Sequence, residues 1–123
     1  MEIKKILVID DSPVARKMLL KVIPNRDEYV FLQAGDGKEG LDIYQKEKPD
    51  LVFLDLTMPV MDGFQCLEIL MKFDPNAKVI VNSADAQKEA KERVLALGAI
   101  KIQDKPPSEE SMISILNWVE DNV

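Results

Sequence analysis

Short apolar runs alternate along the chain with longer segments in which apolar residues recur every three or four positions. A short apolar run bounded by turn residues predicts a strand that is buried on both faces. The runs predict five strands, at residues 6–9, 29–33, 51–55, 78–81 (ending near Ser83) and 99–102. The first, third and fourth runs are the most apolar, so we expect these strands at the centre of a sheet.

The segments between the strands predict helices, and the first of them has a clear beginning. Ser12 is expected to be its N-cap and Pro13 its first residue. Val14, Met18 and Val22 then fall on one helical face.

Turn and cap residues mark the other helices as well. Gly35-Asp36-Gly37 is expected to lead into the second helix and Asp62-Gly63 into the third. A fourth helix is predicted at residues 85–97, with Gly98 at its C-terminal end. Ser108 is expected to cap the last helix, whose apolar stripe consists of Met112, Ile115, Leu116 and Val119.

Strands that alternate with helices predict a parallel sheet, because each helix carries the chain back to start the next strand in the same direction. We therefore expect an α/β fold of the flavodoxin-like, doubly wound kind, with a five-stranded parallel sheet and helices on both faces. The expected strand order is 2-1-3-4-5. The length of 123 residues suits one domain, and we expect it to span residues 1–123 with no output domain.

Composition and charge exclude several classes of function. The formal net charge of -6 argues against a nucleic-acid partner, because such proteins carry a basic surface. The absence of histidine excludes a catalytic triad and a histidine zinc site, and the single cysteine, Cys66, excludes an internal disulfide. No apolar run is long enough for a signal peptide or a membrane span, so we expect a cytoplasmic protein without membrane insertion.

Acidic residues follow two of the strands that are expected to be neighbours. Asp10 and Asp11 follow the first strand, and Asp55 ends the third. In the order 2-1-3-4-5 the carboxyl ends of these strands meet at the topological switch point, so the three carboxylates should share one crevice. Because they repel each other, a hard divalent cation with oxygen ligands is the expected partner, and Mg²⁺ suits such a site.

A hydroxyl and an ammonium group are expected at the same edge of the sheet. Ser83 ends the fourth strand, and Lys105 comes just after the fifth. Together with a metal ion they describe a site for a phosphoryl group, since all of them can bind its oxygens. Because the chain offers no histidine or phosphate-binding Walker loop, a carboxylate is the expected phosphoryl acceptor, and Asp55 is the best candidate.

These residues resemble the receiver domains of two-component response regulators over essentially the whole chain. The resemblance rests on five motifs in their order along the sequence: Asp10-Asp11, Asp55 with Met58-Pro59, Asp62-Gly63, Ser83-Ala84 and Lys105-Pro106.

The resemblance implies a role for each residue of the site. It implies that Asp55 is phosphorylated, that Ser83 and Lys105 contact the phosphoryl group, and that Mg²⁺ is held by Asp10, Asp11, Asp55 and the backbone carbonyl of Thr57. It also implies a histidine kinase or phosphotransfer protein as donor, which more often meets the first helix. The downstream target would be a protein that binds the face of the fourth helix, fifth strand and fifth helix. The resemblance is to stand-alone receivers, which are signalling switches and not enzymes on external substrates.

One position departs from the family pattern. The family often has tyrosine or phenylalanine three residues before the lysine, where the ring turns inward on activation, whereas this chain has Ile102. Switching without that ring would rely on shifts of loops and helices. Thr57 and Asp85 occupy positions that tune dephosphorylation in the family.

Three other readings of the sequence remain open. Gly35 to Gly40 match the G-x-G-x-x-G pattern of nucleotide-binding modules, with Asp55 about 20 residues further on. However, strand two is expected at the sheet edge, away from the crevice, and a turn with positive φ at Gly37 explains that glycine. The second reading is a receiver-like interaction module that is never phosphorylated. The third is a Mg²⁺-dependent phosphohydrolase, for which the sequence offers no substrate-recognition segment.

Overall fold

A computed structural model describes residues 2–58, 61–84 and 88–122 of the chain, and within them one parallel sheet forms the centre of the molecule. Its strands are β1 (Lys5–Ile9), β2 (Val30–Ala34), β3 (Leu51–Asp55), β4 (Val79–Ser83) and β5 (Lys101–Asp104). The strand order is β2-β1-β3-β4-β5, and every neighbouring pair is parallel. The predicted fold class and strand order are confirmed.

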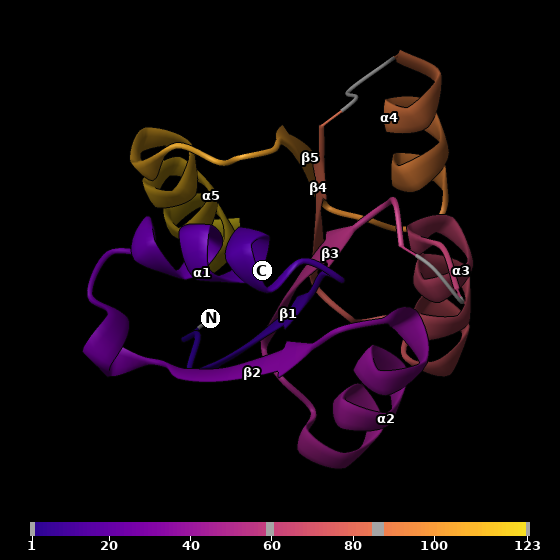
Figure 1. The fold of residues 1–123 in the computed structure, drawn as a ribbon, viewed down its shortest axis with the longest axis horizontal. Coiled ribbons are helices and arrows are strands. Elements are labelled where there is room, and N and C mark those ends of the chain that lie inside the picture. Colours follow the sequence, from indigo (N-terminus) through magenta and orange to yellow (C-terminus); the bar gives the residue numbers. More distant parts are fainter. Residues whose placement is uncertain (1, 59–60, 85–87, 123) are drawn as a thin grey trace.

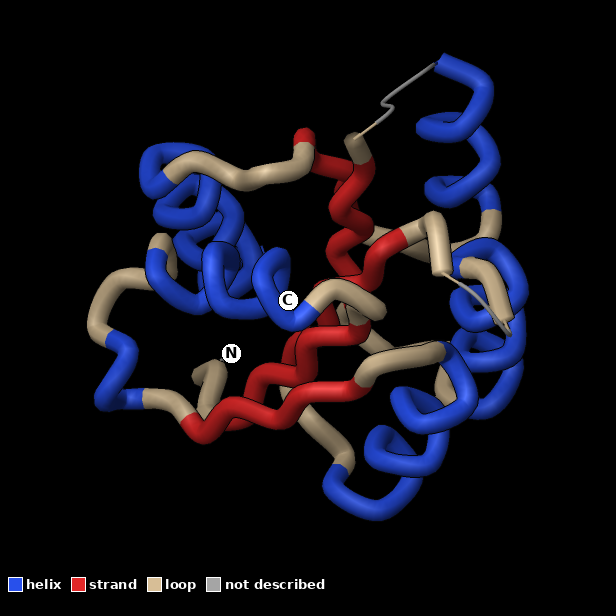
Figure 2. Tube along the Cα trace, viewed as in Figure 1, coloured by secondary structure: helices blue, strands red, loops and turns tan. Residues whose placement is uncertain are grey.

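Helices cover both faces of the sheet, as a doubly wound fold requires. They are α1 (Pro13–Lys21), α2 (Gly37–Glu47), α3 (Gly63–Phe73), α4 (Lys88–Ala96) and α5 (Glu109–Asn122). Figure 1 shows α1 and α5 on one face and α2, α3 and α4 on the other, and Figure 2 shows the strands as one red layer between the blue helices. A short 3-10 helix (Arg26–Glu28), which the sequence pattern did not predict, follows α1.

The hydrophobic core consists of two layers because successive strand residues point to opposite faces. Val8 and Phe53 pack toward α1 and α5, whereas Leu7 and Leu54 pack in the cluster on the other face. All of these side chains are buried. The apolar stripe predicted on α5 is confirmed, since Met112, Ile115, Leu116 and Val119 are all buried in the first of these layers.

The predicted caps are present where the chain enters and leaves helices. The Ser12 hydroxyl accepts a hydrogen bond from the backbone N–H of Ala15, and Asp62 forms a capping box with Gln65 at the start of α3. The Ser108 hydroxyl likewise accepts from a backbone N–H in the first turn of α5. Gly98 has a φ of +113°, in the region that favours glycine.

Of the apolar face predicted for α1, only Val22 packs against the core. Val14 is 67% exposed and Met18 is 45% exposed, whereas Leu19 and Ile23 are buried against the sheet. Both sides of this helix carry apolar residues, so periodicity alone did not decide which side faces the core. The exposed side is therefore an apolar surface next to the start of the helix.

The fifth strand begins and ends two residues later than predicted, at Lys101–Asp104 in place of 99–102. Its third residue, Gln103, is polar and yet buried. Cys66 is buried on α3, as expected of a small apolar side chain.

The prediction of a positive φ at Gly37 is also wrong, because Gly98 is the glycine with positive φ among the described residues. A Cβ on Gly37 would lie 3.0 Å from Sδ of Met61, and one on Gly40 would lie 2.5 Å from Cδ1 of Ile9. These two glycines therefore allow α2 to approach its neighbours closely. β2, which precedes them, is the edge strand, as predicted.

The fourth helix is found as α4 (Lys88–Ala96), while the first three residues of the predicted 85–97 segment, Asp85 among them, lie outside the described residues. In the part of the chain that the structure describes, no helix has the length and apolar character needed to cross a membrane.

Candidate functional site

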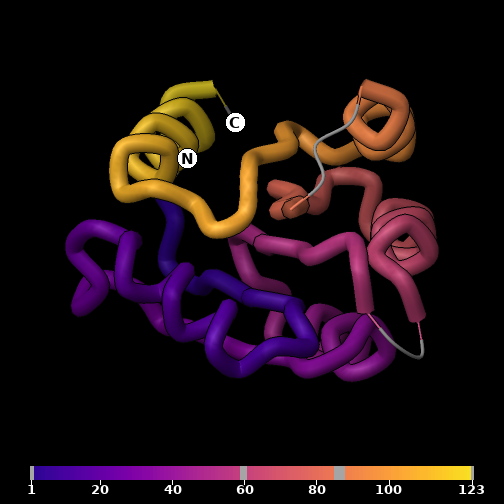
Figure 3. Tube along the Cα trace, turned by 45° about the horizontal axis from the view of Figure 1, so that its top comes forward, coloured from indigo at the N-terminus to yellow at the C-terminus, as the bar shows by residue number. Residues whose placement is uncertain are grey.

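The predicted site residues lie where the strands of the sheet end. Asp10 follows β1, Asp55 is the last residue of β3, and Ser83 is the last residue of β4. Lys105 follows β5 and enters the connection to α5, which Figure 3 shows as the orange segment that runs from the sheet to the last helix. Parallel strands place all of these ends at one edge, which is why residues so distant in sequence meet.

The three acids form one cluster. One carboxylate oxygen from each of Asp10, Asp11 and Asp55 lies within 4.8 Å of those of the other two. Asp10 and Asp55 are buried, whereas Asp11 is exposed at the mouth of the cluster. The predicted convergence of acids from β1 and β3 is therefore present.

Lys105 connects the two buried acids. Its Nζ lies 2.9 Å from Oδ2 of Asp10 and 3.4 Å from Oδ1 of Asp55. The Lys105 side chain is 23% exposed, so the pair is only partly screened by water. Three carboxylates and one ammonium give the site a formal charge of -2.

The electrostatics of the site disfavour the ionised form of Asp55. Burial raises the pKa of Asp55 and the neighbouring Asp10 charge raises it further, while Lys105 and a backbone hydrogen bond from Thr57 lower it by less. Burial alone would lower the pKa of Lys105, but its hydrogen bond to Asp10 and the charges of Asp55 and Asp10 together raise it. Lys105 is thus held firmly in its charged form, and Asp55 carries a charge that the site only partly compensates.

Local contacts hold the loop that carries Asp10. The backbone N–H of Ser12 donates to Oδ1 of Asp10 over 2.9 Å. The Arg16 guanidinium donates to the backbone carbonyl of Asp10 and, through Nε, to the side chain of Gln33 on β2. Arg16 therefore joins α1, the β1 loop and the edge strand, a role that the sequence analysis missed because nothing local in the sequence indicates it.

The loop after Asp55 is held by a close backbone contact. A Cβ on Gly63 would clash with the backbone oxygen of Asp55, so only glycine allows α3 to start here. The Gly63 N–H donates to the backbone carbonyl of Leu56. Thr57 is exposed and Met58 is buried, while Pro59 lies outside the described residues.

Ser83 and Lys105 are joined through the backbone, because the Lys105 N–H donates to the carbonyl of Ser83 over 3.0 Å. The Ser83 side chain is buried at the end of β4. The peptide bond between Lys105 and Pro106 is cis. Ile102 packs against the core on the face of the sheet that α2, α3 and α4 cover, whereas the side chain of its neighbour Gln103 points to the other face.

The acid cluster suits a hard cation in the nature of its ligands. Its donors are all carboxylate oxygens, which Mg²⁺ prefers, and the charge of -2 that the acids and Lys105 carry together balances the +2 of the ion. Oxygens that share one Mg²⁺ are at most about 4.2 Å apart, since each lies about 2.1 Å from the ion. Small side-chain rotations would therefore bring the three acids to that spacing.

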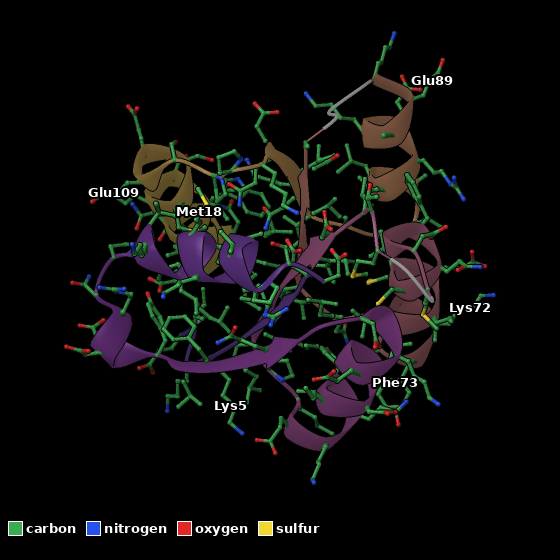
Figure 4. The ribbon with its side chains drawn as sticks, in the orientation of Figure 1. Lys5, Met18, Lys72, Phe73, Glu89 and Glu109 are labelled. Carbon is green, nitrogen blue, oxygen red and sulfur yellow. The ribbon has the colours of Figure 1, made fainter. Side chains whose placement is uncertain are left out.

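A cavity of about 230 Å³ opens beside the site. Asp10, Ser12, Asn82 and Lys105 form its polar part. Its apolar part is contributed by α1 and by the β5–α5 connection, through Val14, Ala15, Met18, Leu19, Pro106 and Pro107. In Figure 4, Met18 lies on the side of α1 that faces α5. The exposed apolar side of α1 is thus continuous with the acidic site.

Comparison with known proteins identifies similar chains. The family model described as the response regulator receiver domain matches residues 6–117. The chain is 36% identical over 116 residues to the chemotaxis protein CheY of Thermotoga maritima, covering 94% of this chain and 97% of that protein. It is 38% identical over 103 residues to sporulation initiation phosphotransferase F of Bacillus subtilis, covering 84% and 82%. A chain in the crystal structure of the CheX–CheY–BeF3–Mg²⁺ complex from Borrelia burgdorferi is 32% identical and superimposes with a TM-score of 0.89, covering 95% and 89%.

Proposed function

The chain belongs to the response regulator receiver family, and from this premise we propose that it is a two-component switch whose phosphoryl acceptor is Asp55. The observation that carries the proposal is the meeting of Asp10, Asp11 and Asp55 in one cluster, with Lys105 between the two buried acids. Like charges at this distance destabilise the fold, so a cluster of three carboxylates is better explained by ligand binding than by a structural role.

The proposed reaction transfers a phosphoryl group from a phosphohistidine of a donor protein. A carboxylate oxygen of Asp55 attacks phosphorus, so that an O–P bond forms and the P–N bond of the donor breaks. The electron pair of that bond stays on the imidazole nitrogen of the donor. The product on this chain is an acyl phosphate, which carboxylates can form.

Other residues of the chain stabilise the charge that the transfer brings into the site. Lys105 already lies within 3.4 Å of Asp55 and would contact an oxygen of the incoming group, while Ser83 would donate its hydroxyl proton to another. Mg²⁺ held by Asp10, Asp11, Asp55 and the Thr57 carbonyl would supply positive charge to the phosphoryl oxygens. Phosphorylation would then shift the balance between two conformations that bind partners differently.

The test uses acetyl phosphate as a small donor, with Mg²⁺ present. We expect the intact mass of the wild-type chain to rise by one phosphoryl group, and the Asp55→Asn variant to show no rise. Asp50→Asn, at the other end of β3, serves as the matched control and should be phosphorylated like the wild type. Phosphate uptake by Asp55→Asn would refute the assignment. No uptake by the wild type would favour the reading as an interaction module that is never phosphorylated.

The proposed donor is a histidine kinase or phosphotransfer protein that docks on α1. The exposed side chains of Val14 and Met18 and the cavity beside them form an apolar surface that leads directly to the acids. An apolar surface of this kind suits the face of a helix on the donor, which would bring its phosphohistidine to Asp55.

Docking on α1 is tested with a purified histidine kinase that phosphorylates the wild-type chain. Met18→Asp should slow transfer from the kinase at least about tenfold, since a charge in an apolar contact costs more than 1.4 kcal/mol, but it should leave uptake from acetyl phosphate unchanged. Ile69→Asp, at an exposed apolar position on α3, is the control that should leave both rates unchanged. Equal effects of the two substitutions would exclude α1 as the docking surface.

For the downstream target we propose the face formed by α4, β5 and α5. Leu95 on α4 and Trp118 on α5 are exposed there, and Nζ of Lys101 lies 4.9 Å from the centre of the Trp118 ring. Aromatic rings and paired cations are common anchors in protein interfaces. The proposed output is a change in affinity for a protein, not a reaction on an external substrate.

A further inference from the structure

A row of polar side chains crosses the sheet at the level of the acids. Asp10 and Asp55 belong to this row, because the residues before them, Ile9 and Leu54, are register partners. Asp55 is paired with Asn82 on β4, and Asn82 is paired with Gln103 on β5. Register partners in a parallel sheet point to the same face, here the face covered by α1 and α5 (Figure 1). The row therefore continues from the acidic site toward α5.

Hydrogen bonds join the outer half of this row to α5. Nε2 of Gln103 donates to Oδ1 of Asn82 over 2.6 Å, and the Ser111 hydroxyl donates to Oε1 of Gln103 over 2.8 Å. Asn82 is 4% exposed and Gln103 is 7% exposed, so water does not compete for these bonds. Ser111 stands beside Met112, which is fully buried in the core of the α5 face.

The last residue of this line of hydrogen bonds, Asn82, borders the site. Asn82 lines the same cavity as Asp10 and Lys105. Because its oxygen accepts from Gln103, the amino group is the end of the Asn82 amide that is directed away from β5. Buried amides are costly to the fold unless they are paired, so this pair responds to any change that alters its partners.

We propose that Asn82, Gln103 and Ser111 form a hydrogen-bonded link that couples the charge at the Asp55 site to the position of α5. The inference rests on the function proposed above and describes how a change of charge at that site would be transmitted to α5. It gives this chain a route from the site to the α5 face that does not need an aromatic side chain at Ile102.

The chemistry of amides gives the link two states. In the observed state each donor points from α5 toward the site, from Ser111 to Gln103 and from Gln103 to Asn82. If both amides turn over, Asn82 donates to Gln103 and Gln103 donates to Ser111, and the carbonyl of Asn82 faces the cavity in place of the amino group. Both arrangements keep two bonds, so a change of charge at the site can select between them.

Phosphorylation supplies such a change of charge. It converts the Asp55 carboxylate into a group with more negative charge, and it draws Lys105 away from Asp10 toward the phosphoryl oxygens. Either change alters the field at the Asn82 amide, whose register partner is Asp55. At the far end, reversal takes away the acceptor of the Ser111 hydroxyl, which must then find another partner at the start of α5.

The experiment records NMR spectra of the full-length, ¹⁵N-labelled chain before and after three changes at the site: addition of Mg²⁺, addition of BeF3⁻ with Mg²⁺, and the substitution Asp55→Asn. We expect the side-chain NH2 signals of Asn82 and Gln103 and the backbone signals around Ser111 to shift with the charge at the site. In Gln103→Met, which keeps the length of the side chain but removes both hydrogen bonds, the shifts around Ser111 should be lost.

Matched serine variants make the result specific to the link. Ser111→Ala should also lose the α5 response, while Ser114→Ala, at an exposed position on the same helix, should keep it. Because Ser111 is not part of the site, Ser111→Ala should still take up one phosphoryl group from acetyl phosphate. Ser111→Ala also decides the question if Gln103→Met does not fold.

The outcomes separate this inference from the proposed function. If α5 responds equally in the wild type, Gln103→Met and Ser111→Ala, the link is refuted while phosphorylation of Asp55 stands. If the wild type takes up no phosphoryl group but Asp55→Asn shifts the Ser111 signals only when Gln103 is present, the link stands and the proposed function falls.

Discussion

The two ends of the sheet use aspartate in opposite ways. At the amino end, Oδ2 of Asp50 accepts hydrogen bonds from the backbone N–H groups of Lys4 and Lys5, both over 2.9 Å. Asp74 accepts from the Tyr44 hydroxyl over 2.6 Å and from the backbone N–H of Asn76 over 3.0 Å. These acids fasten strands and turns to each other.

At the carboxyl end the same residue type is short of partners for its charge. Burial and the charge of Asp10 raise the pKa of Asp55. At the other end the hydrogen bond from Tyr44 lowers the pKa of Asp74, against a smaller opposing effect of burial. The direction of the pKa shift thus separates an acid that stabilises the fold from one that is held ready for a ligand.

The largest effect that should distinguish the two ends is that of Mg²⁺. At a concentration about 100 times its Kd, Mg²⁺ should raise the free energy of unfolding by about 2.7 kcal/mol, because it binds the folded chain alone. Asp11→Ala should lose most of this increase, and Asp50→Ala should keep it in full despite a less stable starting point. Urea unfolding with and without Mg²⁺ measures both, and an undiminished increase in Asp11→Ala would remove that residue from the metal site.

The next effect concerns the amino end. Tyr44→Phe should lower the free energy of unfolding by about 2 kcal/mol at neutral pH, since it removes a hydrogen bond to a charged group. Because the folded pKa of Asp74 is below its unfolded value, this contribution is present above the unfolded pKa and is lost as the pH falls through the folded one.

Urea unfolding of wild type and Tyr44→Phe over a series of pH values checks this prediction. The two curves should converge on acidification. A constant difference between them would mean that the hydroxyl group acts through packing and not through the Asp74 charge.

A smaller effect of opposite sign is expected for Asp55→Asn without Mg²⁺. The folded pKa of Asp55 is above its unfolded value, so its stabilising contribution is complete below the unfolded pKa and is lost as the pH rises through the folded one. The neutral amide of the variant avoids that loss of stability, so its free energy of unfolding should exceed that of the wild type at neutral pH. The difference between the two should shrink on acidification. Thermal unfolding measures this difference, and a less stable variant at neutral pH would show that Lys105 fully compensates Asp55.

The smallest effect is expected at an exposed ion pair on α3. Nζ of Lys72 lies 3.2 Å from Oε1 of Glu68, and both side chains are well exposed to solvent. Lys72→Ala should change the free energy of unfolding by less than about 0.5 kcal/mol. The effects at the two ends of the sheet are compared with this small change in the free energy of unfolding. A larger decrease in Lys72→Ala would show that the alkyl part of the Lys72 side chain packs on the helix.

The sequence predicted the sheet and its site well because both depend on local patterns. Buried parallel strands need continuous apolar runs, and 6–9 and 51–55 are such runs, each followed by a segment with helical periodicity. The closeness of Asp10, Asp55 and Lys105 can then be predicted as well, since residues at or just after the ends of parallel strands share one edge of the sheet. Their proximity is confirmed, while their roles in phosphoryl transfer stay predictions.

Prediction was wrong where two local solutions were equally good. On α1 both sides carry apolar residues, and the spacing of Val14, Met18 and Val22 predicts a face of which only Val22 packs against the core. Leu19, outside that face, is the buried residue of the helix. The end of β5 was placed too early because Gln103 is polar. Its burial depends on Asn82 and Ser111, which no pattern around residue 103 reveals.

The residue pattern along the chain is enough to predict the main strands and helices, the order of the strands in the sheet and the side chains that reach its carboxyl edge. The side of α1 that stays exposed, the partners of Gln103 and the direction of each aspartate's pKa shift depend on the folded arrangement of the chain. The reason is that strand and helix patterns arise from neighbours along the chain. Burial, hydrogen-bond partners and nearby charges come from residues that are distant in sequence and become neighbours through folding.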